Sequence, residues 1–223
     1  MKSTSALINA RVESTRVPRK LVRPFGGTTL LEIALEKLNR MDFVEHRYLA
    51  VADEELMGMA KGYPNVEVLR RDPAAVKKGV NPQQVTFAHY LKVPSDFILV
   101  FNPCLPFVRL ETIRNAYEYF QRTDFRSYTS AVPTGDWIFD EQGNALTNSD
   151  PLNLTTNKNV KFFKAAHAFH IVDRRYFQAH GHHWTFSRDD PHLIRIPEEE
   201  AVDVDTEVEF EVAEALYRRA AVD

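Results

Sequence analysis

The sequence predicts an α/β protein built on a mostly parallel sheet. Short apolar runs alternate with helix-length amphipathic stretches through the first half of the chain, which is typical of βαβ units. Residues 97–101 are an uninterrupted apolar run, as expected for a central strand buried on both faces. A chain of 223 residues with 44% hydrophobic residues is long enough to build one substantial core. We therefore expect residues 1–223 to form a single domain, folded as a three-layer sandwich.

The first half of the chain contains regularly alternating strands and helices. Apolar residues recur at helical spacing after Thr29, which is a good N-cap residue, and Glu32 follows at the position of a capping box. A second amphipathic stretch stops at Gly62, a typical residue after a helix end. The expected strands cover residues 6–10, 48–52 and 66–69, and the expected helices cover residues 29–38 and 54–61.

The second half of the chain continues this order less regularly. Residues 72–82 contain Pro, Gly and two Lys without any period, so we expect a loop that contacts ligand. Residues 133–159 are polar and rich in Asn and turn residues. We expect residues 133–195 to form a small embedded lobe that protrudes from the domain. Further helices are expected at residues 83–91, 110–120 and 207–219, and further strands at residues 97–101, 128–132, 168–172 and 202–204.

The charge balance argues against a nucleic-acid-binding protein. There are 28 Lys and Arg against 31 Asp and Glu, so the formal net charge is −3 and no basic field surrounds the molecule. Cys104 is the single cysteine and cannot form an intramolecular disulfide, which favours a cytoplasmic protein. The first residues lack a signal-peptide pattern, and no stretch approaches the roughly 20 apolar residues that cross a bilayer. We expect neither nucleic acid nor membrane as a partner.

The segment after the first predicted strand is the strongest functional signal. It reads Arg11-Val12-Glu13-Ser14-Thr15-Arg16-Val17-Pro18-Arg19-Lys20, with four cations and two hydroxyl groups. Open α/β sheets bind their ligands at the carboxyl ends of strands, and a mixture of Arg and Lys suits a polyphosphate. The segment lacks the glycines of a Walker loop or a dinucleotide fingerprint. On charge alone, a solvated turn is the alternative.

Three motifs occur in order along the chain. The first is Ala10-Arg11-x-x-Ser14-Thr15-Arg16-x-Pro18-x-Lys20, the second is Asn102-Pro103-Cys104-Leu105-Pro106, and the third is Val202-Asp203-Val204-Asp205-Thr206-Glu207. Together they resemble the cytidylyltransferases that activate acidic sugars, which include the acylneuraminate and 3-deoxy-manno-octulosonate enzymes and relatives in spore-coat polysaccharide synthesis. The second motif stands where the family has a Gln-Pro-Thr-Ser-Pro turn, and the third is similar to its closing Ile-Asp-Thr-Glu block. The resemblance covers nearly the whole chain.

This resemblance implies a fold of the nucleotide-diphospho-sugar transferase type and a CTP-dependent nucleotidyltransferase. Such an enzyme forms a CMP conjugate of an acidic sugar and releases pyrophosphate. We expect the triphosphate of CTP to be bound by Arg11, Ser14, Thr15, Arg16 and Lys20, with Arg11 and Lys20 acting in catalysis. The resemblance also implies a Mg²⁺ cofactor, a small acidic acceptor as partner, and a homodimer formed through the lobe.

Two aspartates near the carboxyl terminus are candidate metal ligands. Asp203 and Asp205 lie two residues apart, so on a strand both side chains point to one face and can reach one hard cation. Spacing alone equally allows Asp205 or Thr206 to cap the following helix. The family resemblance assigns this block to metal binding.

The acceptor-binding residues are expected in the middle of the chain. Where the acylneuraminate enzymes have Thr-Ser this chain has Cys104-Leu105, and the Arg that follows the second Pro is displaced by one position. His167 and His170 lie three apart around a predicted strand, so we expect at most one of them to face the cleft. The candidate acceptor-binding residues are Asn102, Arg109, His167 and His170.

The sequence also allows two other functions. The changed acceptor motifs also fit a transferase of the same fold that uses another nucleoside triphosphate or a non-sugar acceptor such as a phosphonate. A non-catalytic nucleotide-binding or interface protein is the second alternative. Cys104 has no paired His in the sequence and is expected to be a small apolar filler. Residues 180–183 hold three His but no Cys partner, which argues against a specific metal site there.

Overall fold

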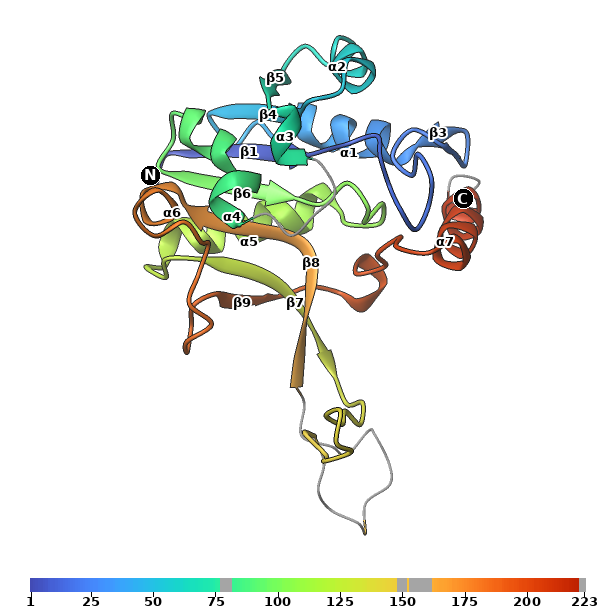
Figure 1. Ribbon diagram of the computed structural model, residues 1–223, viewed down its shortest axis with the longest axis vertical. Helices are drawn as coiled ribbons and strands as arrows, with labels where there is room; N and C mark the ends of the chain where they lie inside the picture. The colour runs from blue at the N-terminus through green and yellow to red at the C-terminus, as the bar shows by residue number, and fades with distance from the viewer. Residues whose placement is uncertain (77–81, 148–151, 153–161, 221–223) are drawn as a thin grey trace.

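The computed structural model describes residues 1–76, 82–147, 152 and 162–220. Its main strands are β1 (Thr4–Asn9), β4 (His46–Val51), β5 (Glu67–Arg70), β6 (Phe97–Phe101), β7 (Tyr128–Thr134), β8 (Phe162–Asp173) and β9 (His192–Arg195). Among the described residues they form one seven-stranded sheet in the order β5-β4-β1-β6-β8-β7-β9 (Figure 1). Only the pairs that involve β8 are antiparallel. The predicted α/β fold with a mostly parallel sheet is therefore confirmed.

The helices follow the predicted apolar periods closely. They are α1 (Leu30–Asn39), α2 (Glu54–Ala60), α3 (Pro73–Val76), α4 (Gln83–Thr86), α5 (Leu110–Arg122), α6 (Arg174–His180) and α7 (Glu207–Ala220), with 3-10 helices η1 (Ala88–Lys92) and η3 (Glu198–Glu200). The predicted N-cap is confirmed, because the Thr29 hydroxyl accepts a hydrogen bond of 3.2 Å from the backbone N–H of Glu32. A small hairpin of β2 (Pro24–Phe25) and β3 (Thr28–Thr29) precedes α1.

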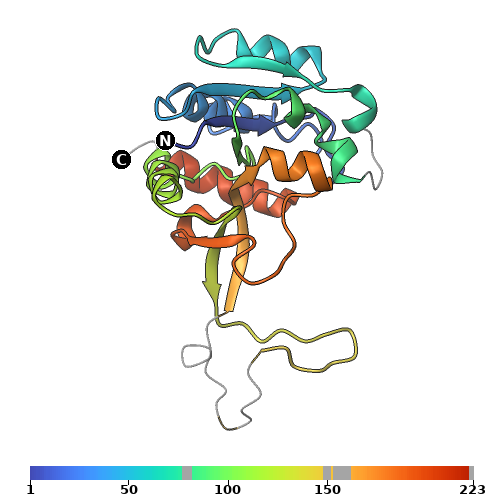
Figure 2. The same cartoon turned by 90° about the vertical axis from the view of Figure 1, so that its left-hand side faces the viewer.

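The core lies on both faces of the sheet, which makes the fold three-layered. Along β1, Ala6 and Ile8 belong to one buried cluster while Leu7 belongs to another, as strand alternation requires. The first cluster includes apolar residues of α1, α5 and α7, and the second includes Tyr90 of η1 and Phe177 of α6. Helices accordingly cover the sheet from two sides (Figures 1 and 2). This packing leaves the carboxyl ends of β1 and β6 accessible from one edge.

The prediction of one continuous helix over residues 83–91 is wrong. The chain forms the short helix α4 and then the 3-10 helix η1, with Phe87 between them in a non-helical conformation. This break turns the Phe87 ring against Tyr90, at 5.1 Å between ring centroids. Packing of the two rings thus outweighs the continuation of a regular helix.

The strand predicted at residues 168–172 is much longer. β8 has 12 residues and pairs with β6 through its second half and with β7 along its length. Thr129 pairs with His170, but Ala131 pairs with Ala165, so β8 contains an irregular excursion between these partners. The Ser130 hydroxyl fills this excursion and accepts hydrogen bonds from the backbone N–H groups of Ala168 and Phe169. A β-bulge of this kind redirects side chains.

Only part of the predicted lobe at residues 133–195 projects from the domain. β8, α6 and β9 fall within this range, yet they belong to the main sheet and its covering layer. The projecting part, which we call the arm, comprises residues 134–147 and the outer end of β8 (Figures 1 and 2). Residues 148–151 and 153–161 lie outside the described residues. No helix in the described ranges is long and apolar enough to cross a membrane.

Candidate active site

A cavity of about 590 Å³ lies at the carboxyl ends of β1 and β6. This is the edge where open α/β sheets hold their ligands. Its wall includes Asn9, the last residue of β1, and Phe101, the last residue of β6. The loop after β1, the loop after β6, the bulge of β8 and the segment before α7 also contribute to the wall. Elements from both halves of the chain therefore meet around one space.

All five residues predicted to bind the nucleotide line this cavity: Arg11, Ser14, Thr15, Arg16 and Lys20. Val17 and Leu21 are buried in the core and anchor the loop. Lys20 is folded inwards between these anchors and is itself buried, whereas Arg11 and Arg16 are exposed at the cavity mouth. Arg19, the fourth cation of the loop, forms an ion pair with Glu55 and is not among the lining residues. The structure thus separates three cations that face the cavity from one that does not.

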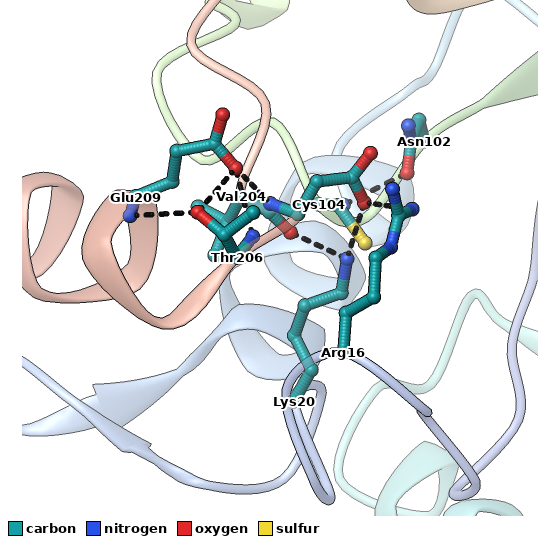
Figure 3. A network of polar contacts seen from close by, with 8 residues as sticks. Arg16, Lys20, Asn102, Cys104, Val204, Thr206 and Glu209 are labelled. Carbon is teal, nitrogen blue, oxygen red and sulfur yellow. Dashed lines mark hydrogen bonds and ion pairs between the residues drawn. The ribbon is translucent and has the colours of Figure 1, made fainter.

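The two predicted acidic residues also line the cavity, although the predicted strand at residues 202–204 is wrong. Residues 201–205 are irregular, because the Val204 N–H bonds the Cys104 carbonyl at 3.0 Å in the loop after β6 instead of joining a sheet. Lys20 Nζ donates to the Val204 carbonyl and to Asp205 Oδ1, the latter at 3.1 Å (Figure 3). Arg16 lies 2.8 Å from the same Asp205 oxygen. The loop after β1 and the segment before α7 are therefore in direct contact.

The helix cap at this place is provided by Thr206, so Asp205 is free for the ion pairs. The Thr206 hydroxyl accepts from the Glu209 N–H at 3.2 Å, and the Glu209 carboxylate accepts from the Thr206 N–H at 2.7 Å (Figure 3). This reciprocal pair is a capping box. Of the two caps that spacing allowed, Thr206 is the one observed.

Asp203 has the properties of a ligand for a hard cation. Within the described part of the chain, its buried Oδ1 has no hydrogen-bond partner. Burial, reinforced by the charge of Asp205, raises the pKa of Asp203 to about 6. No group of three His, Cys, Asp or Glu that could hold a metal occurs among the described residues. Two carboxylates nevertheless fit Mg²⁺, which usually keeps waters and takes its other ligands from substrate phosphates.

Lys20 keeps its positive charge in this setting. Burial alone would lower the pKa of Lys20, but a hydrogen bond to the Cys104 sulfur and the charge of the Asp205 carboxylate together raise it above its ordinary value. The thiol of Cys104 is itself held neutral, because burial raises its pKa. Cys104 packs against the core as expected, and it also lies beside the Lys20 ammonium, which the sequence did not indicate.

The predicted acceptor residues are only partly brought together. Asn102 lines the cavity, and its side-chain oxygen accepts from the Cys104 N–H at 2.9 Å, which shapes the turn after β6. The prediction for Arg109 is wrong in position: its side chain is bound to Glu200 at 2.5 Å and is not among the residues lining the cavity. Glu200 is 1% exposed and also accepts from the Arg109 N–H and the Thr112 hydroxyl. A buried carboxylate needs such partners, so it holds Arg109 away from the cavity.

Both His167 and His170 line the cavity, so the expectation that at most one would face it is wrong. The bulge in β8 breaks the strand alternation on which that expectation depended. His167 has a positive φ of 54°, a conformation that a non-glycine residue rarely adopts. The two rings lie 5.6 Å apart, and the Thr129 hydroxyl lies 2.8 Å from His170 Nδ1.

Several lining residues were not singled out as candidates from the sequence: Asn9, Phe87, Tyr90, His183 and Trp184. Asn9 is a polar residue at the carboxyl end of β1, and that position could have identified it from the sequence as a lining residue. Its amide oxygen lies 2.7 Å from His89 Nε2, and its amide nitrogen donates to the Tyr90 hydroxyl at 3.2 Å. Tyr90 belongs to η1, whereas His183 and Trp184 follow α6 almost 100 residues later, so no local pattern could show that these rings meet.

Comparison with known proteins identifies relatives of this chain. Residues 5–219 match the family model described as Cytidylyltransferase. The 3-deoxy-manno-octulosonate cytidylyltransferase of Rickettsia felis is 24% identical over 135 residues, covering 59% of this chain and 52% of the relative. The enzyme of the same name from Rickettsia akari is 23% identical with the same coverage. The chain thus matches about half the length of these curated relatives.

Solved structures share the fold at low sequence identity. CMP:2-keto-3-deoxy-manno-octonic acid synthetase complexed with CTP superposes with a TM-score of 0.70 at 14% identity, covering 98% of this chain and 100% of the other. 4-Diphosphocytidyl-2C-methyl-D-erythritol synthase from Anaerococcus prevotii gives a TM-score of 0.67 at 14% identity, covering 98% and 97%. At these identities the likeness concerns the fold alone.

Proposed function

Because the chain belongs to the cytidylyltransferase family, we propose that it transfers a cytidylyl group from CTP to an acidic sugar. The products are a CMP conjugate and pyrophosphate. The observation that carries this proposal is the contact of Lys20 and Arg16 with Asp205 beside the unpartnered oxygen of Asp203. Cations for a triphosphate and carboxylates for its divalent ion then face the same cavity.

The proposed reaction is an in-line displacement at the α-phosphorus of CTP. A hydroxyl oxygen of the acceptor forms the new bond to this phosphorus while the bond to the pyrophosphate oxygen breaks, and the hydroxyl proton leaves to solvent. Little covalent chemistry is required of the protein, so catalysis comes from positioning and charge neutralisation. Arg11 and Arg16 bind the β- and γ-phosphates, with Ser14 and Thr15 as hydroxyl donors, and Lys20 meets the charge that grows on the α-phosphoryl oxygens.

Mg²⁺ is part of this proposal, with Asp203 and Asp205 as its protein ligands. When bound, it offsets charge on the attacked phosphate and on departing pyrophosphate. Lys20 and Arg16 hold Asp205 in place for this role, since both contact its Oδ1. Asp203 is held nearby by the backbone bond between Val204 and Cys104.

Pyrophosphate release tests the proposal directly. The protein is incubated with Mg²⁺, one nucleoside triphosphate at a time and a panel of 3-deoxy-2-keto acid sugars. We expect release with CTP and an acid sugar, and none when the sugar is omitted. A thermal shift with CTP that is accompanied by no release from any combination would instead support a non-catalytic binding protein.

One observation favours a second candidate function. Arg109, the cation expected to meet the acceptor carboxylate, is bound to Glu200 outside the cavity. A transferase of the same fold that uses another nucleoside triphosphate or a non-sugar acceptor such as a phosphonate is consistent with this change. Release of pyrophosphate with such a pair, at a higher kcat/KM than with CTP and an acid sugar, would establish it.

We also propose that the protein is a homodimer paired through its arm. Large apolar side chains are exposed there, namely Trp137, Ile138, Phe139 and Leu146. An apolar patch of this kind is typical of an interface between subunits. Light scattering after size-exclusion chromatography should give twice the mass of the chain, and Ile138→Asp should shift the protein towards monomer.

A further inference from the structure

The hairpin of β2 and β3 packs directly on α7. The ring of Phe25 contacts two rings of the helix, with centroid distances of 5.3 Å to Phe210 and 5.3 Å to Tyr217. The Gly26 N–H donates to the Glu214 carboxylate at 3.0 Å. A Cβ at Gly26 would lie 2.8 Å from Tyr217 Cδ1, closer than packed atoms approach, so the glycine allows this close contact. The hairpin and α7 therefore form one packed unit.

Arg23 precedes this hairpin and carries a polar contact to the same helix. Its guanidinium donates to Glu207 at 2.6 Å and lies 4.4 Å from the centroid of the Phe210 ring. Glu207 is the first residue of α7, and both side chains of the pair are partly exposed. Neither residue lines the cavity. We call the contact between Arg23 and Glu207 the outer ion pair.

A tight turn connects Arg23 to Lys20. The N–H groups of Val22 and Arg23 both donate to the Arg19 carbonyl, at 3.0 and 2.9 Å. Lys20 lies inside this turn, so a displacement of Arg23 also displaces the backbone that carries Lys20. The outer ion pair is thus mechanically coupled to the buried cation of the cavity.

The start of α7 provides a similar coupling on the acidic side. The capping box of Thr206 fixes the first turn of the helix, which contains Glu207. Asp205 directly precedes this capping residue. The contact of Lys20 with Asp205 inside the cavity and the outer ion pair outside it therefore join the same two segments of the chain.

The contact inside the cavity cannot set the spacing of these segments during the proposed reaction. The phosphates of CTP and their divalent ion have to come between Lys20 and Asp205, so the direct contact of these side chains must open. The outer ion pair lies away from the cavity and can stay closed throughout. A partly exposed ion pair stabilises a fold only slightly, so its loss should change the geometry of the site more than the stability of the protein.

We infer that Arg23 is a positioning residue, which through Glu207 holds the Lys20 side of the cavity at a fixed distance from Asp203 and Asp205. The inference rests on the proposed function, because it assigns what aligns the cations and the carboxylates of that site. Its effect falls on the turnover number, since a small displacement of the reacting groups slows a displacement step strongly. The affinity for the acceptor does not depend on it.

A double-mutant cycle of Arg23→Met and Glu207→Gln tests the outer ion pair. Methionine retains an apolar contact with Phe210 and removes the charge. At saturating CTP and Mg²⁺ we expect kcat of pyrophosphate release to fall about tenfold in either variant and no further in the double variant. The KM for the acid sugar should change by less than about twofold. Arg23→Lys keeps the ion pair and should retain roughly half of the wild-type kcat or more.

The ion pair of Arg70 and Glu54 is the matched control. Its two atoms are 2.8 Å apart, Glu54 is the first residue of α2, and neither residue lines the cavity. Arg70→Met and Glu54→Gln should leave kcat within about twofold of wild type. The melting temperatures of all these variants should lie within about 3 °C of the wild-type value, because each loses only a partly exposed ion pair.

Nucleotide binding gives a readout without turnover. Isothermal titration calorimetry measures the Kd of CTP in EDTA and in saturating Mg²⁺, with no acceptor present. Wild type should bind CTP more tightly in Mg²⁺, and in Arg23→Met this gain should be reduced by at least about threefold, because the carboxylates are no longer held in place. The Kd in EDTA should change by less than about twofold, since Arg11, Arg16 and Lys20 remain.

A merely structural role gives a different pattern. A lower melting temperature of Arg23→Met with unchanged kcat and an unchanged effect of Mg²⁺ overturns the inference, as does an equal loss of kcat in Arg70→Met. A double variant about ten times slower than either single variant overturns it too, because the two side chains would then act separately. If Arg23→Met does not fold, Glu207→Gln decides by the same measurements.

The two measurements separate this inference from the proposed function. Release by the wild type that is equally fast in both variants of the outer ion pair overturns the inference and leaves the function standing. Absence of release from every nucleoside triphosphate and acceptor overturns the function, while the effect of Mg²⁺ on CTP binding still decides the role of Arg23. Absence of both release and CTP binding in the wild type overturns both.

Discussion

The two ends of the cavity are built in different ways. The cationic end consists of one continuous loop, residues 11–20, and one short acidic segment around Asp203 and Asp205. Another part of the cavity wall consists of rings from η1, the bulge of β8 and the segment after α6, namely Tyr90, His167, His170, His183 and Trp184. A triphosphate site needs several cations close together, and here they lie close together along the chain, where the sequence shows them. The rings come from three separate segments, so no local sequence pattern marks them.

Removal of Lys20 should have the largest effect on activity. We expect Lys20→Ala to lower kcat by about two to four orders of magnitude, because it removes the buried cation that, in the proposed mechanism, meets the charge developing on the phosphate. The matched control is Arg19→Ala in the same loop, whose side chain pairs with Glu55. Steady-state pyrophosphate release and circular dichroism should show a folded, inactive Lys20 variant and an active Arg19 variant. Equal turnover of Lys20→Ala and wild type would remove the loop from the mechanism.

Asp203→Asn should separate activity from stability. We expect kcat to fall about 10- to 100-fold, because the proposed Mg²⁺ would lose one of its two protein carboxylates. Burial raises the pKa of Asp203 from 3.8 to about 6 in the folded protein. Ionisation of Asp203 therefore favours the unfolded state, and the free energy of unfolding of the wild type falls as the pH rises from about 4 through 6. At pH 7 the variant should therefore be more stable than wild type by up to about 3 kcal/mol.

Urea unfolding at several pH values between 4 and 7, without nucleotide or metal, measures this difference. The wild-type free energy of unfolding should decline relative to that of Asp203→Asn as the pH rises. A variant that is less stable at pH 7 would mean that Asp203 makes a favourable contact in the folded protein.

Glu200 connects the loop after β6 to the segment that carries the aspartates, and its loss should destabilise the protein. Burial lowers the pKa of Lys37 to about 8, and the negative charge of Glu200 opposes this fall. Glu200→Ala leaves the half-buried Lys37 without that charge and removes the buried acceptor of Arg109 and Thr112, so we expect a cost of about 3–5 kcal/mol in the free energy of unfolding. The exposed neighbour Glu199 is the control, and Glu199→Ala should change stability by less than about 0.5 kcal/mol. Urea unfolding that gives similar values for both variants would contradict this role.

Arg109→Ala should have the smallest effect on the reaction. Since Arg109 is bound to Glu200 and does not line the cavity, we expect the KM for the acid sugar to change by less than about twofold. Initial-rate kinetics at saturating CTP would measure it. A tenfold rise in this KM with CTP binding intact would restore the role that the sequence predicted for Arg109.

Much of the fold could be predicted because local patterns and global packing agree. The apolar residues of α1, α5 and β6 follow from which faces of these elements are buried. The structure places all three elements within a few residues of the predicted ranges. Residues 83–91 and 202–204 were predicted wrongly, because contacts with distant partners outweigh local propensity there. Phe87 turns to meet Tyr90, and Val204 bonds Cys104.

The candidate site divides in the same way. Charge and motif identified seven candidate residues that all line the cavity: Arg11, Ser14, Thr15, Arg16, Lys20, Asp203 and Asp205. His167 and His170 were assigned to opposite faces because a regular strand was assumed, and the bulge in β8 changed that. Arg109 was misplaced because the sequence did not show that Glu200 is buried beside it.

The amino-acid sequence by itself determined the α/β class, the cationic loop and the acidic segment, because these depend on periodicity and on charge close along the chain. Only the tertiary structure decided that Lys20 meets Asp205 across 185 residues, that both histidines face the cavity, and that rings from three segments line the same cavity. The physical reason is that each of these features depends on where the sheet places the ends of its strands, and strand order and bulges are set by packing between distant segments.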